Sequence, residues 1–500
     1  MCCALQNTGA NPQPACYEAP MGRPILTPQE MLAAEQAVFN TGTDRFTLMQ
    51  RAGEAVAEFV HAHWPDGQIQ VLCGPGGNGG DGFIAAAALA KLWRKVEVYS
   101  VLPVSELTGD TAKAASAWEG PVHKLEDALK SQPELIVDAL YGAGLTRPLE
   151  GAAAELAQRG GRVISVDVPS GIDGYTGKPL GPAFQAEATL TFAALRPAHV
   201  LLPGSAFSGV VMVADIGVPV KTALAENSPA LWHSQMPQPG FGVHKYQRGH
   251  LKVVSGGPWN TGAARLTAKA GLRAGAGLVT MLSPPDAAGV HAAHLTAIML
   301  APFVTPDDLA AYAARSTAMV IGPAAGVTDA TRANVEAILK GPARVVLDAD
   351  ALTAFGEDPE VLFKQLRPTD ILTPHEGEFS RLFGDLLATS DNKVQATRAA
   401  AAKAGCVILL KGADTVIAQP DGNALVNTHA TRWLATAGSG DVLAGIIAGF
   451  MAQGVDTFVA AAIGCWLHGE AGRRVGAGLI AEDIEMQLPV ILSALHGELG

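Results

Sequence analysis

The chain has 500 residues, enough for two domains that each bury a full hydrophobic core. Hydrophobic residues make up 48% of it, which argues against disorder, and the formal net charge of −12 without a basic stripe argues against nucleic acid as a partner. No uninterrupted apolar run reaches membrane-spanning length and no signal-peptide pattern is present, so we expect a soluble cytoplasmic protein without a membrane partner.

The sequence predicts four consecutive parts. Residues 1–22 are polar and contain prolines, and we expect them to form a disordered leader. Two α/β domains are expected at 23–221 and 244–500. The stretch between them, 222–243, contains prolines and little periodicity, which is typical of a linker.

Three apolar runs in the first half each lead into a polar or glycine-rich loop. The run 71–72 precedes the glycine-rich stretch 74–82 and a helix expected to begin near Phe83. The run 135–137 precedes Asp138, and the run 163–166 precedes Asp167. A strand, a glycine loop and a helix form an arrangement that cradles phosphates. Each aspartate taken singly is equally typical of a turn or cap.

Taken together, these loops resemble the NAD(P)H-hydrate epimerase domain over about 24–220, and residues 46–53 match its early helix. The resemblance implies interconversion of the R and S forms of hydrated NADH and NADPH (NADHX and NADPHX). It also implies a potassium ion held by Asn78, Asp138 and Ser170, whose oxygen atoms suit a hard cation. Asp167 is the candidate acid/base, because inversion at C6 requires proton transfer.

By the same resemblance, one set of loop residues is expected to line the hydrated nicotinamide and its phosphates. The set consists of Gly77, Asn78, Gly79, Gly80, Asp81, Gly142, Ala143, Gly144, Leu145, Thr146, Arg147, Pro148 and Asp167. Three positions depart from the family pattern: Gln50 stands where the family usually has glutamate, Gly77 replaces an asparagine, and Arg196 stands where many relatives have lysine. Arginine keeps the charge but does not readily act as a base.

The second half repeats the format of apolar runs that end in small or polar residues. Such runs are typical of buried parallel strands, and ligands bind at the carboxyl ends of strands in an open parallel sheet. The predicted strands are 251–254, 319–321, 345–347, 371–372 and 407–410.

Residues 435–445 carry the most informative motif of the chain. Gly438, Ser439 and Gly440 lead into an apolar helix with Asp441 in its first turn. Unpaired N–H groups at a helix start bind anions, and a carboxylate there can exchange a proton with a hydroxyl group. Taken alone, the motif is also typical of an ordinary helix start with an aspartate favoured by the dipole.

With residues 244–245, 261–264, 272–280, 373–378 and 411–412, this motif resembles the NAD(P)H-hydrate dehydratases over about 244–500. The resemblance implies the fold class α/β, with an N-terminal Rossmann-like three-layer domain followed by a C-terminal ribokinase-like domain. It implies removal of water from the S form, driven by ADP, with ATP as the alternative, and with magnesium to neutralise the polyphosphate. A homo-oligomer is expected.

The resemblance also assigns roles in the second half. The hydrated cofactor is expected beside Ala263, Ala324, His375 and Asp441, with Asp441 managing the proton of the C6 hydroxyl; Ala324 replaces a glycine of the family pattern. The residues expected to contact the adenine nucleotide are Lys411, Gly412, Ala413, Asp414, Thr415 and Gly440.

Two other functions stay open on the residues alone. The Gly-Ser-Gly-Asp motif equally suits phosphoryl transfer to a vitamin or sugar hydroxyl, so the second half could be a kinase. The first half could be a nucleotide-binding scaffold without activity. His375, for its part, could be a buried histidine with a structural role.

Overall fold

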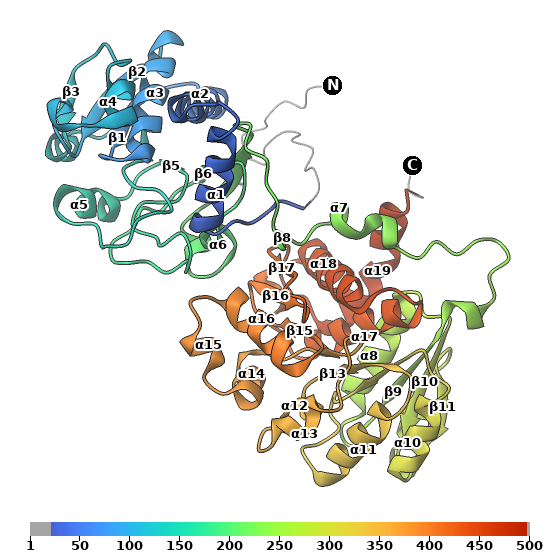
Figure 1. Cartoon of the computed structure of the whole chain (residues 1–500). Coiled ribbons are helices and arrows are strands. Elements are labelled where there is room, and N and C mark those ends of the chain that lie inside the picture. Colours follow the sequence, from blue (N-terminus) through green and yellow to red (C-terminus); the bar gives the residue numbers. More distant parts are fainter. Residues whose placement is uncertain (1–21, 498–500) are drawn as a thin grey trace.

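The computed structural model describes residues 22–497, so the predicted leader lies outside the described residues except for Gly22. Figure 1 shows two α/β bodies in sequence order, the first coloured blue to green and the second green to red. Each body has its own sheet, which confirms the predicted α/β fold class. Within residues 22–497, none of the helices combines the length and apolarity needed to span a bilayer.

The first sheet is parallel throughout and has the strand order β3-β2-β1-β4-β5-β6-β7. Its strands are β1 (Gln68–Cys73), β2 (Lys95–Ser100), β3 (Val122–Lys124), β4 (Leu135–Ala139), β5 (Val163–Val166), β6 (Ala188–Phe192) and β7 (Val210–Ala214). Its helices are α1 (Pro28–Phe39), α2 (Arg45–His63), α3 (Gly77–Lys91), α4 (Gly109–Ala115), α5 (Gly151–Arg159) and α6 (Pro197–Val200). Side chains of α1 to α4 form the core on one face and those of α5 on the other, which gives three layers.

Helix α3 begins earlier than the sequence predicted. Its first residue is Gly77, with Gly76 as the N-cap, rather than a residue near Phe83. A glycine is required inside this first turn, because a Cβ atom at Gly79 would lie 1.8 Å from the Gly74 carbonyl oxygen. Of the predicted cofactor-binding glycines, Gly77, Gly79 and Gly80 therefore belong to a helix start rather than to a loop.

The second sheet has the strand order β11-β10-β9-β12-β13-β14-β15-β16-β17-β8. Its strands are β8 (Leu224–Glu226), β9 (His250–Val254), β10 (Leu278–Ser283), β11 (Met299–Pro302), β12 (Ala318–Ile321), β13 (Arg344–Leu347), β14 (Ile371–Leu372), β15 (Val407–Leu410), β16 (Thr415–Ala418) and β17 (Ala424–Asn427). The strands predicted in this half are β9, β12, β13, β14 and β15, and their mutual pairings are parallel as expected. Strand β16 pairs antiparallel with both neighbours.

Helices cover both faces of this second sheet. One apolar core contains residues of α7, α8, α17, α18 and α19, and the core on the other face contains residues of α10 to α16. The helices are α7 (Pro229–Trp232), α8 (Thr261–Arg273), α9 (Pro285–Ala292), α10 (Pro306–Ala313), α11 (Asp329–Leu339), α12 (Asp350–Thr353), α13 (Pro359–Phe363), α14 (Glu376–Phe383), α15 (Leu386–Thr389), α16 (Lys393–Ala404), α17 (Ser439–Ala452), α18 (Thr457–Val475) and α19 (Ala481–Leu495).

Much of the expected linker, 222–243, is built into the second body. Strand β8 adds to the edge of the second sheet by pairing with β17. Trp232 of α7 is 1% exposed, and its indole N–H donates to the Asn227 Oδ1 atom at 3.0 Å. The reason is burial of apolar side chains, since both Leu224 and Trp232 find partners in the second half.

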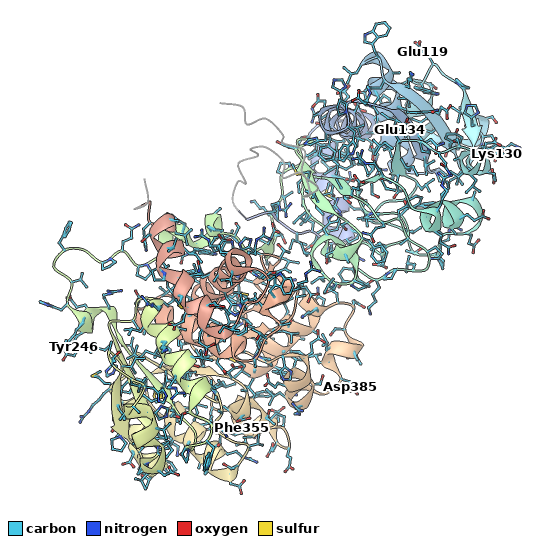
Figure 2. All side chains as sticks on the ribbon, turned by 180° about the vertical axis from the view of Figure 1, so that it is seen from behind. Glu119, Lys130, Glu134, Tyr246, Phe355 and Asp385 are labelled. Carbon is cyan, nitrogen blue, oxygen red and sulfur yellow. The ribbon has the colours of Figure 1, made fainter. Side chains whose placement is uncertain are left out.

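The outer surface away from the other body carries Tyr246, which follows the expected linker. Figure 2 shows Tyr246 at the margin of the second body, while Glu119, Lys130 and Glu134 lie on the first. The Tyr246 side chain is strongly exposed, and the ammonium group of Lys245 lies over its ring in a cation–π contact. The structure therefore gives Tyr246 a place on the surface rather than in either predicted site.

Two candidate active sites

Asp167 lies directly after β5, at the carboxyl edge of the first sheet. Its φ of +64° is a left-handed conformation that a residue with a side chain adopts only at a cost in energy. Three groups hold its carboxylate: the Thr191 hydroxyl donates at 3.0 Å, the Ala143 N–H donates at 2.8 Å, and the Arg196 guanidinium lies at 3.3 Å. The backbone conformation and these three contacts thus fix the position of the Asp167 carboxylate.

The surroundings of Asp167 keep it ionised. Burial raises the pKa of this carboxyl, but the charge of Arg196 and the hydrogen bonds from Ala143 and Thr191 outweigh burial, so the pKa lies below its usual range. His199 contacts the Asp167 carbonyl oxygen through Nε2 at 2.8 Å, and burial lowers the pKa of His199 to about 4. The histidine is therefore neutral at pH 7 and Arg196 provides the charge.

Two nearby carboxyls behave in the opposite way. Burial, together with the negative charges of Asp167 and Glu35, raises the pKa of Asp81 well above its usual value. Burial also raises the pKa of Glu35, against the lowering effect of Arg196. Neighbouring acids with pKa values shifted in opposite directions are suited to act as an acid and a base.

Asn78 and Gly142 lie beside Asp167. A Cβ atom at Gly142 would come 2.6 Å from the Asp167 Oδ2 atom and 3.3 Å from the Asn78 Oδ1 atom, so these three predicted residues converge. The Asn78 Nδ2 atom is buried and has no hydrogen-bond partner. A buried amide without a partner is costly, which marks this point as a place for a bound group.

Asp138 and Ser170 contact each other directly. The Ser170 hydroxyl donates to the Asp138 carboxylate at 2.6 Å, the Ser170 N–H donates at 2.8 Å and the Ser165 hydroxyl donates at 2.9 Å. The Asp138 side chain is fully buried, and burial raises its pKa against these hydrogen bonds. With the Asn78 amide, the set supplies only oxygen ligands and one carboxylate, which fits the chemistry of a potassium ion.

The remaining predicted residues of the first half divide by exposure. Gly79 and Gly80 are buried under the helix start, whereas Gly144, Thr146, Arg147 and Pro148 are exposed and Leu145 packs into the core. Gly77 is also exposed, at the first position of α3. The other exposed residues follow Ala143 in the chain and lie at the surface, outside the buried part of the site.

Asp441 lies in the first turn of α17, as the sequence predicted. Gly438, at φ +83°, is the N-cap and its left-handed conformation turns the chain into the helix. Burial and the charges of Asp348 and Asp350 together raise the pKa of Asp441 to about 6, against the lowering effect of Lys411. A half-buried carboxylate with this pKa is well matched to proton transfer near pH 7.

Lys411 supplies the positive charge that acts on this carboxylate. Its ammonium group lies 2.8 Å from Asp348 and 3.8 Å from Glu378, and a Cβ atom at Gly440 would lie 3.6 Å from it. Burial lowers the pKa of Lys411, but these carboxylates outweigh burial and raise it. Lys411 therefore stays charged beside the helix start, where an anionic phosphate would be stabilised.

The predicted neighbours of Asp441 also gather here. The Thr267 hydroxyl lies 3.0 Å from both the Ala263 and the Asp441 carbonyl oxygens, which places α8 against α17. The loop containing Ala324 reaches the same place, because Gly326 donates its N–H to Asp350 at 2.8 Å. Ala324 has φ +55°, a left-handed conformation that glycine adopts without strain, which agrees with the glycine that the resemblance led us to expect here.

His375 is an exposed helix cap rather than a buried histidine. Its Nδ1 atom accepts the N–H groups of Gly377 and Glu378 at 3.0 and 3.2 Å, at the start of α14. Its Nε2 atom lies 3.4 Å from the Glu378 carboxylate, which in turn faces Lys411. His375 is therefore joined to the site through Glu378, with its Nδ1 atom occupied by the cap.

The loop 411–415 is closed by its own hydrogen bonds. The Thr415 hydroxyl donates to the Gly412 carbonyl at 2.8 Å and accepts the Gly412 N–H at 3.1 Å, while Gly412 and Ala413 are exposed. Asp414 is buried and bonds to Lys393 at 2.8 Å. Its carboxylate therefore faces the protein, leaving the exposed backbone of the loop available to a ligand.

Several residues of the two clusters were not expected there from the sequence. Arg196 was noted only as a departure, Glu378 only as part of the motif 373–378, and Asp348 only as the residue that follows the predicted strand 345–347. Lys393 and Glu35 were not considered. The first three stand within motifs that suggested a ligand, so their chemistry could have been considered. Lys393 and Glu35 carry no local signal, because only the tertiary fold brings them to the sites.

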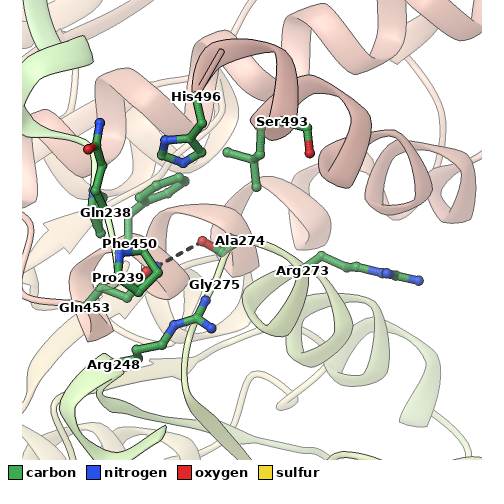
Figure 3. Close-up of a pocket in the computed structure, with 12 residues that line it drawn as sticks. Gln238, Pro239, Arg248, Arg273, Ala274, Gly275, Phe450, Gln453, Ser493 and His496 are labelled. Atoms are coloured by element: carbon green, nitrogen blue, oxygen red, sulfur yellow. Dashed lines mark hydrogen bonds between the residues drawn. The ribbon is translucent and has the colours of Figure 1, made fainter. Parts of the chain in front are cut away.

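The pocket in Figure 3 contains none of the predicted site residues. Its lining includes Arg248, Phe450, Gln453 and His496, and the Gln453 amide donates to the Ala274 carbonyl at 2.9 Å. This pocket is thus separate from the two clusters around Asp167 and Asp441.

Comparison with known proteins identifies the family. A family model described as NAD(P)H-hydrate dehydratase matches residues 251–488, and one described as YjeF-related protein N-terminus matches residues 45–198. A crystal structure of the ADP/ATP-dependent NAD(P)H-hydrate dehydratase of Bacillus subtilis is 26% identical, with a TM-score of 0.47, and the match covers 54% of this chain and 98% of that one.

Two relatives match nearly the whole chain. A bifunctional NAD(P)H-hydrate repair enzyme of Moorella thermoacetica is 35% identical over 493 residues, which cover 90% of this chain and 93% of the relative. The enzyme of the same description from Coxiella burnetii is 33% identical over 483 residues, which cover 92% and 97%. The chain therefore belongs to the family of bifunctional NAD(P)H-hydrate repair enzymes.

Proposed function

We propose that this chain catalyses both repair reactions: the first half epimerises the R and S forms of NADHX and NADPHX, and the second half dehydrates the S form to NADH or NADPH at the expense of ADP. The proposal rests on one observation: each of the two domains has its own aspartate in a charged site. Asp167 pairs with Arg196, and Asp441 lies in the first turn of a helix, near Lys411. The Asp167 site suits a base that stays ionised, and the Asp441 site suits the binding of phosphate.

In the first half, Asp167 accepts the proton of the C6 hydroxyl as the C6–N1 bond opens to give an aldehyde, and Asp81 gives a proton to the released nitrogen. Closure on the other face of the aldehyde, with both proton transfers reversed, inverts C6. The lowered pKa keeps Asp167 ionised, and the raised pKa keeps Asp81 protonated. Potassium would be held by Asn78, Asp138 and Ser170 and would offer positive charge to the ligand's oxygen atoms. Asp138→Ala should remove the carboxylate that this ion needs and slow R/S interconversion, with dehydration of the S form intact.

The potassium assignment has a direct test. Epimerase rates of wild type and Asp138→Ala are measured in potassium and in its absence. Wild type should depend on the ion and the variant should not. Equal rates for both proteins in both conditions would contradict the assignment.

In the second half, Asp441 accepts the proton of the C6 hydroxyl while the hydroxyl oxygen bonds to the terminal phosphorus of the nucleotide. The bond between that phosphorus and the bridging oxygen breaks. Phosphate later leaves C6 with the former hydroxyl oxygen, C5 loses a proton to water, and the C5=C6 double bond forms. N–H groups at the start of α17 and the Lys411 ammonium stabilise the negative charge.

Magnesium is expected to arrive on the nucleotide. Among the residues that the structure describes, no cluster of three or more histidine, cysteine or acidic side chains could hold a metal ion. Magnesium commonly binds through substrate phosphates and one or two carboxylates, so the absence of a protein cage is compatible with its use. No step of the mechanism above depends on it.

The proposal is tested by incubating the protein with hydrated NADH and either ADP or ATP. Recovery of the absorbance of the reduced ring reports dehydration, and chromatography of the R and S forms reports epimerisation. ADP should support faster recovery than ATP. Absence of recovery with both nucleotides would contradict the dehydratase assignment.

Three further properties are part of the proposal. Domains at 23–221 and 244–500 should each be active, with most of 222–243 belonging structurally to the second; fragments that start at 222 test this division. The cytoplasmic location and the homo-oligomer stay predictions, which cell fractionation and light scattering check.

A further inference from the structure

A short stretch of the first body reaches from one active site toward the other. We name residues 195–202, which include α6, the coupling segment. At one end, Arg196 pairs with the Asp167 carboxylate at 3.3 Å and His199 contacts the Asp167 carbonyl oxygen at 2.8 Å. At the other end, the Leu202 N–H donates to the Asp414 carboxylate of the second body at 2.9 Å.

Asp414 belongs to the loop 411–415, so this contact joins the coupling segment to that loop. Its second carboxylate oxygen accepts from the Lys393 ammonium group at 2.8 Å, and the same ammonium group lies 3.5 Å from the Lys411 carbonyl oxygen. A Cβ atom at Gly412 would overlap with the Lys393 Nζ atom. The Lys393 ammonium group therefore packs against the backbone of Lys411 and Gly412 and helps to fix its position.

Burial shields these contacts from solvent. The side chains of Lys393 and Asp414 are 8% and 11% exposed, so solvent screens their attraction little. Leu195, Val200 and Leu201 of the coupling segment lie in the same apolar core as residues of β13, β15 and β16. The segment therefore packs as part of the second body while it holds Asp167 of the first.

A second contact joins the same two places. The Asn392 amide, at the start of α16, donates to the Tyr175 carbonyl oxygen at 3.0 Å. Gly174 beside it accepts the Ala198 N–H at 3.2 Å, and a Cβ atom at Gly174 would lie 2.6 Å from Ala143. Ala143 is the residue whose N–H holds the Asp167 carboxylate.

We propose that the coupling segment, Asp414 and Lys393 link the two active sites energetically, so that nucleotide on the loop 411–415 tightens binding of the hydrated dinucleotide at the epimerase site, and the reverse. The inference rests on the proposed nucleotide role of that loop. Each ligand orders the same chain of contacts, so the second ligand to bind meets an arrangement that is already ordered. Lys393 and Asp414 act as positioning residues.

The test measures epimerisation by the full chain with and without α,β-methylene-ADP. The methylene group replaces the bridging oxygen, so the terminal phosphate cannot leave and dehydration does not consume the substrate. Coupling between sites is typically 5–150-fold, and we expect the analogue to lower the epimerase KM by about fivefold with little change in kcat.

Variants of one helix supply matched controls. Lys393→Met should abolish the fall in KM, and Lys393→Arg, which keeps the charge, should restore it. Lys403→Met is the control, because Lys403 lies at the other end of α16 and pairs with Glu360 at 3.2 Å on the surface; its KM should still fall. A fall in KM that survives Lys393→Met would overturn the proposed route.

Calorimetry separates the two levels of the argument. If the analogue binds the wild type but leaves the epimerase KM unchanged, the coupling is wrong and the nucleotide role stands. If the analogue does not bind at all, the nucleotide role of the loop 411–415 fails and the coupling fails with it.

Discussion

Asp167 and Asp441 are the same residue type at the edges of two parallel sheets, yet their surroundings prepare them differently. Asp167 is held by Arg196, and its pKa lies below the usual range. Asp441 is half-buried near Asp348 and Asp350, and its pKa is raised to about 6. The difference teaches that the partner of a buried carboxylate, rather than its place in the sheet, decides whether its charge is fixed or exchangeable.

Asp441→Asn should give the largest effect and separate the two halves. Asparagine keeps the size of aspartate but cannot accept the proton of the C6 hydroxyl. Losses of general acid–base catalysis are on the order of 10²–10⁴-fold, and we expect dehydration to fall by about that factor while nucleotide still binds. A coupled assay on mixed epimers, with chromatography of the R and S forms, follows both activities.

Epimerisation is the internal control for this variant, because Asp167 and Asp138 belong to the other sheet. Near-normal recovery of NADH by Asp441→Asn would show that Asp441 only stabilises the first turn of α17 and takes no part in catalysis. Loss of both activities would indicate misfolding.

Arg196→Met should make Asp167 resemble Asp441. Without the guanidinium, burial is no longer outweighed, so the pKa of Asp167 should rise. An opposite charge at this distance lowers a carboxyl pKa by about 1–3 units, so epimerisation should be lost on acidification at a pH about 1–3 units higher than in the wild type. The pH profile of epimerase kcat/KM reports the shift.

Arg196→Lys is the matched control, since it keeps the positive charge. Its pH profile should stay close to that of the wild type. An unshifted profile for Arg196→Met would show that the hydrogen bonds from Thr191 and Ala143 alone hold the pKa of Asp167 down.

The pH dependence of the wild type should differ between the two activities. A raised pKa means that Asp441 takes up its proton at a higher pH, so a reaction that needs its carboxylate is lost as pH falls through about 6. Below that value dehydratase kcat/KM should fall about tenfold per pH unit. Asp167, with its lowered pKa, should keep epimerisation nearly constant over the same range. Superimposable profiles would contradict the contrast between the two aspartates.

The parts that sequence predicted are those specified locally. Apolar runs that end in glycine or aspartate gave the strands around both sites, and Gly438 marked the start of α17. Helix α3 began earlier than expected because a glycine-rich stretch has low helix propensity and tertiary packing overrides it. Strand β8 and Trp232 were assigned to a linker because their apolar partners lie about two hundred residues away in the chain, on β17 and α18.

The same distinction holds for the sites. Asp167, Asp441 and Lys411 stand in recognisable motifs, whereas Glu35 and Lys393 reach the sites from helices without any motif. The contact between Leu202 and Asp414 joins residues 212 positions apart, and it uses a backbone N–H group that any sequence would have. Such contacts depend on how the bodies pack, which no local pattern encodes.

The smallest effect concerns backbone strain, which the two regions treat differently. Asp167 and Ala324 both adopt positive φ, at +64° and +55°. Asp167 needs its side chain, and three groups hold that side chain in place. The Ala324 methyl group makes no such contribution, so Ala324→Gly should relieve strain of about 1–2 kcal/mol against a cost of about 0.4–1 kcal/mol from the freer unfolded chain.

The net gain should be about 0.5 kcal/mol, visible as a higher denaturant midpoint for the second body. Ala325→Gly is the matched control, because Ala325 is not among the residues with positive φ and should only lose stability. Asp167→Gly completes the comparison: it also relieves strain, but it removes the carboxylate and therefore epimerisation. An unchanged or lower midpoint for Ala324→Gly would mean that the methyl group packs well enough to offset its strained backbone.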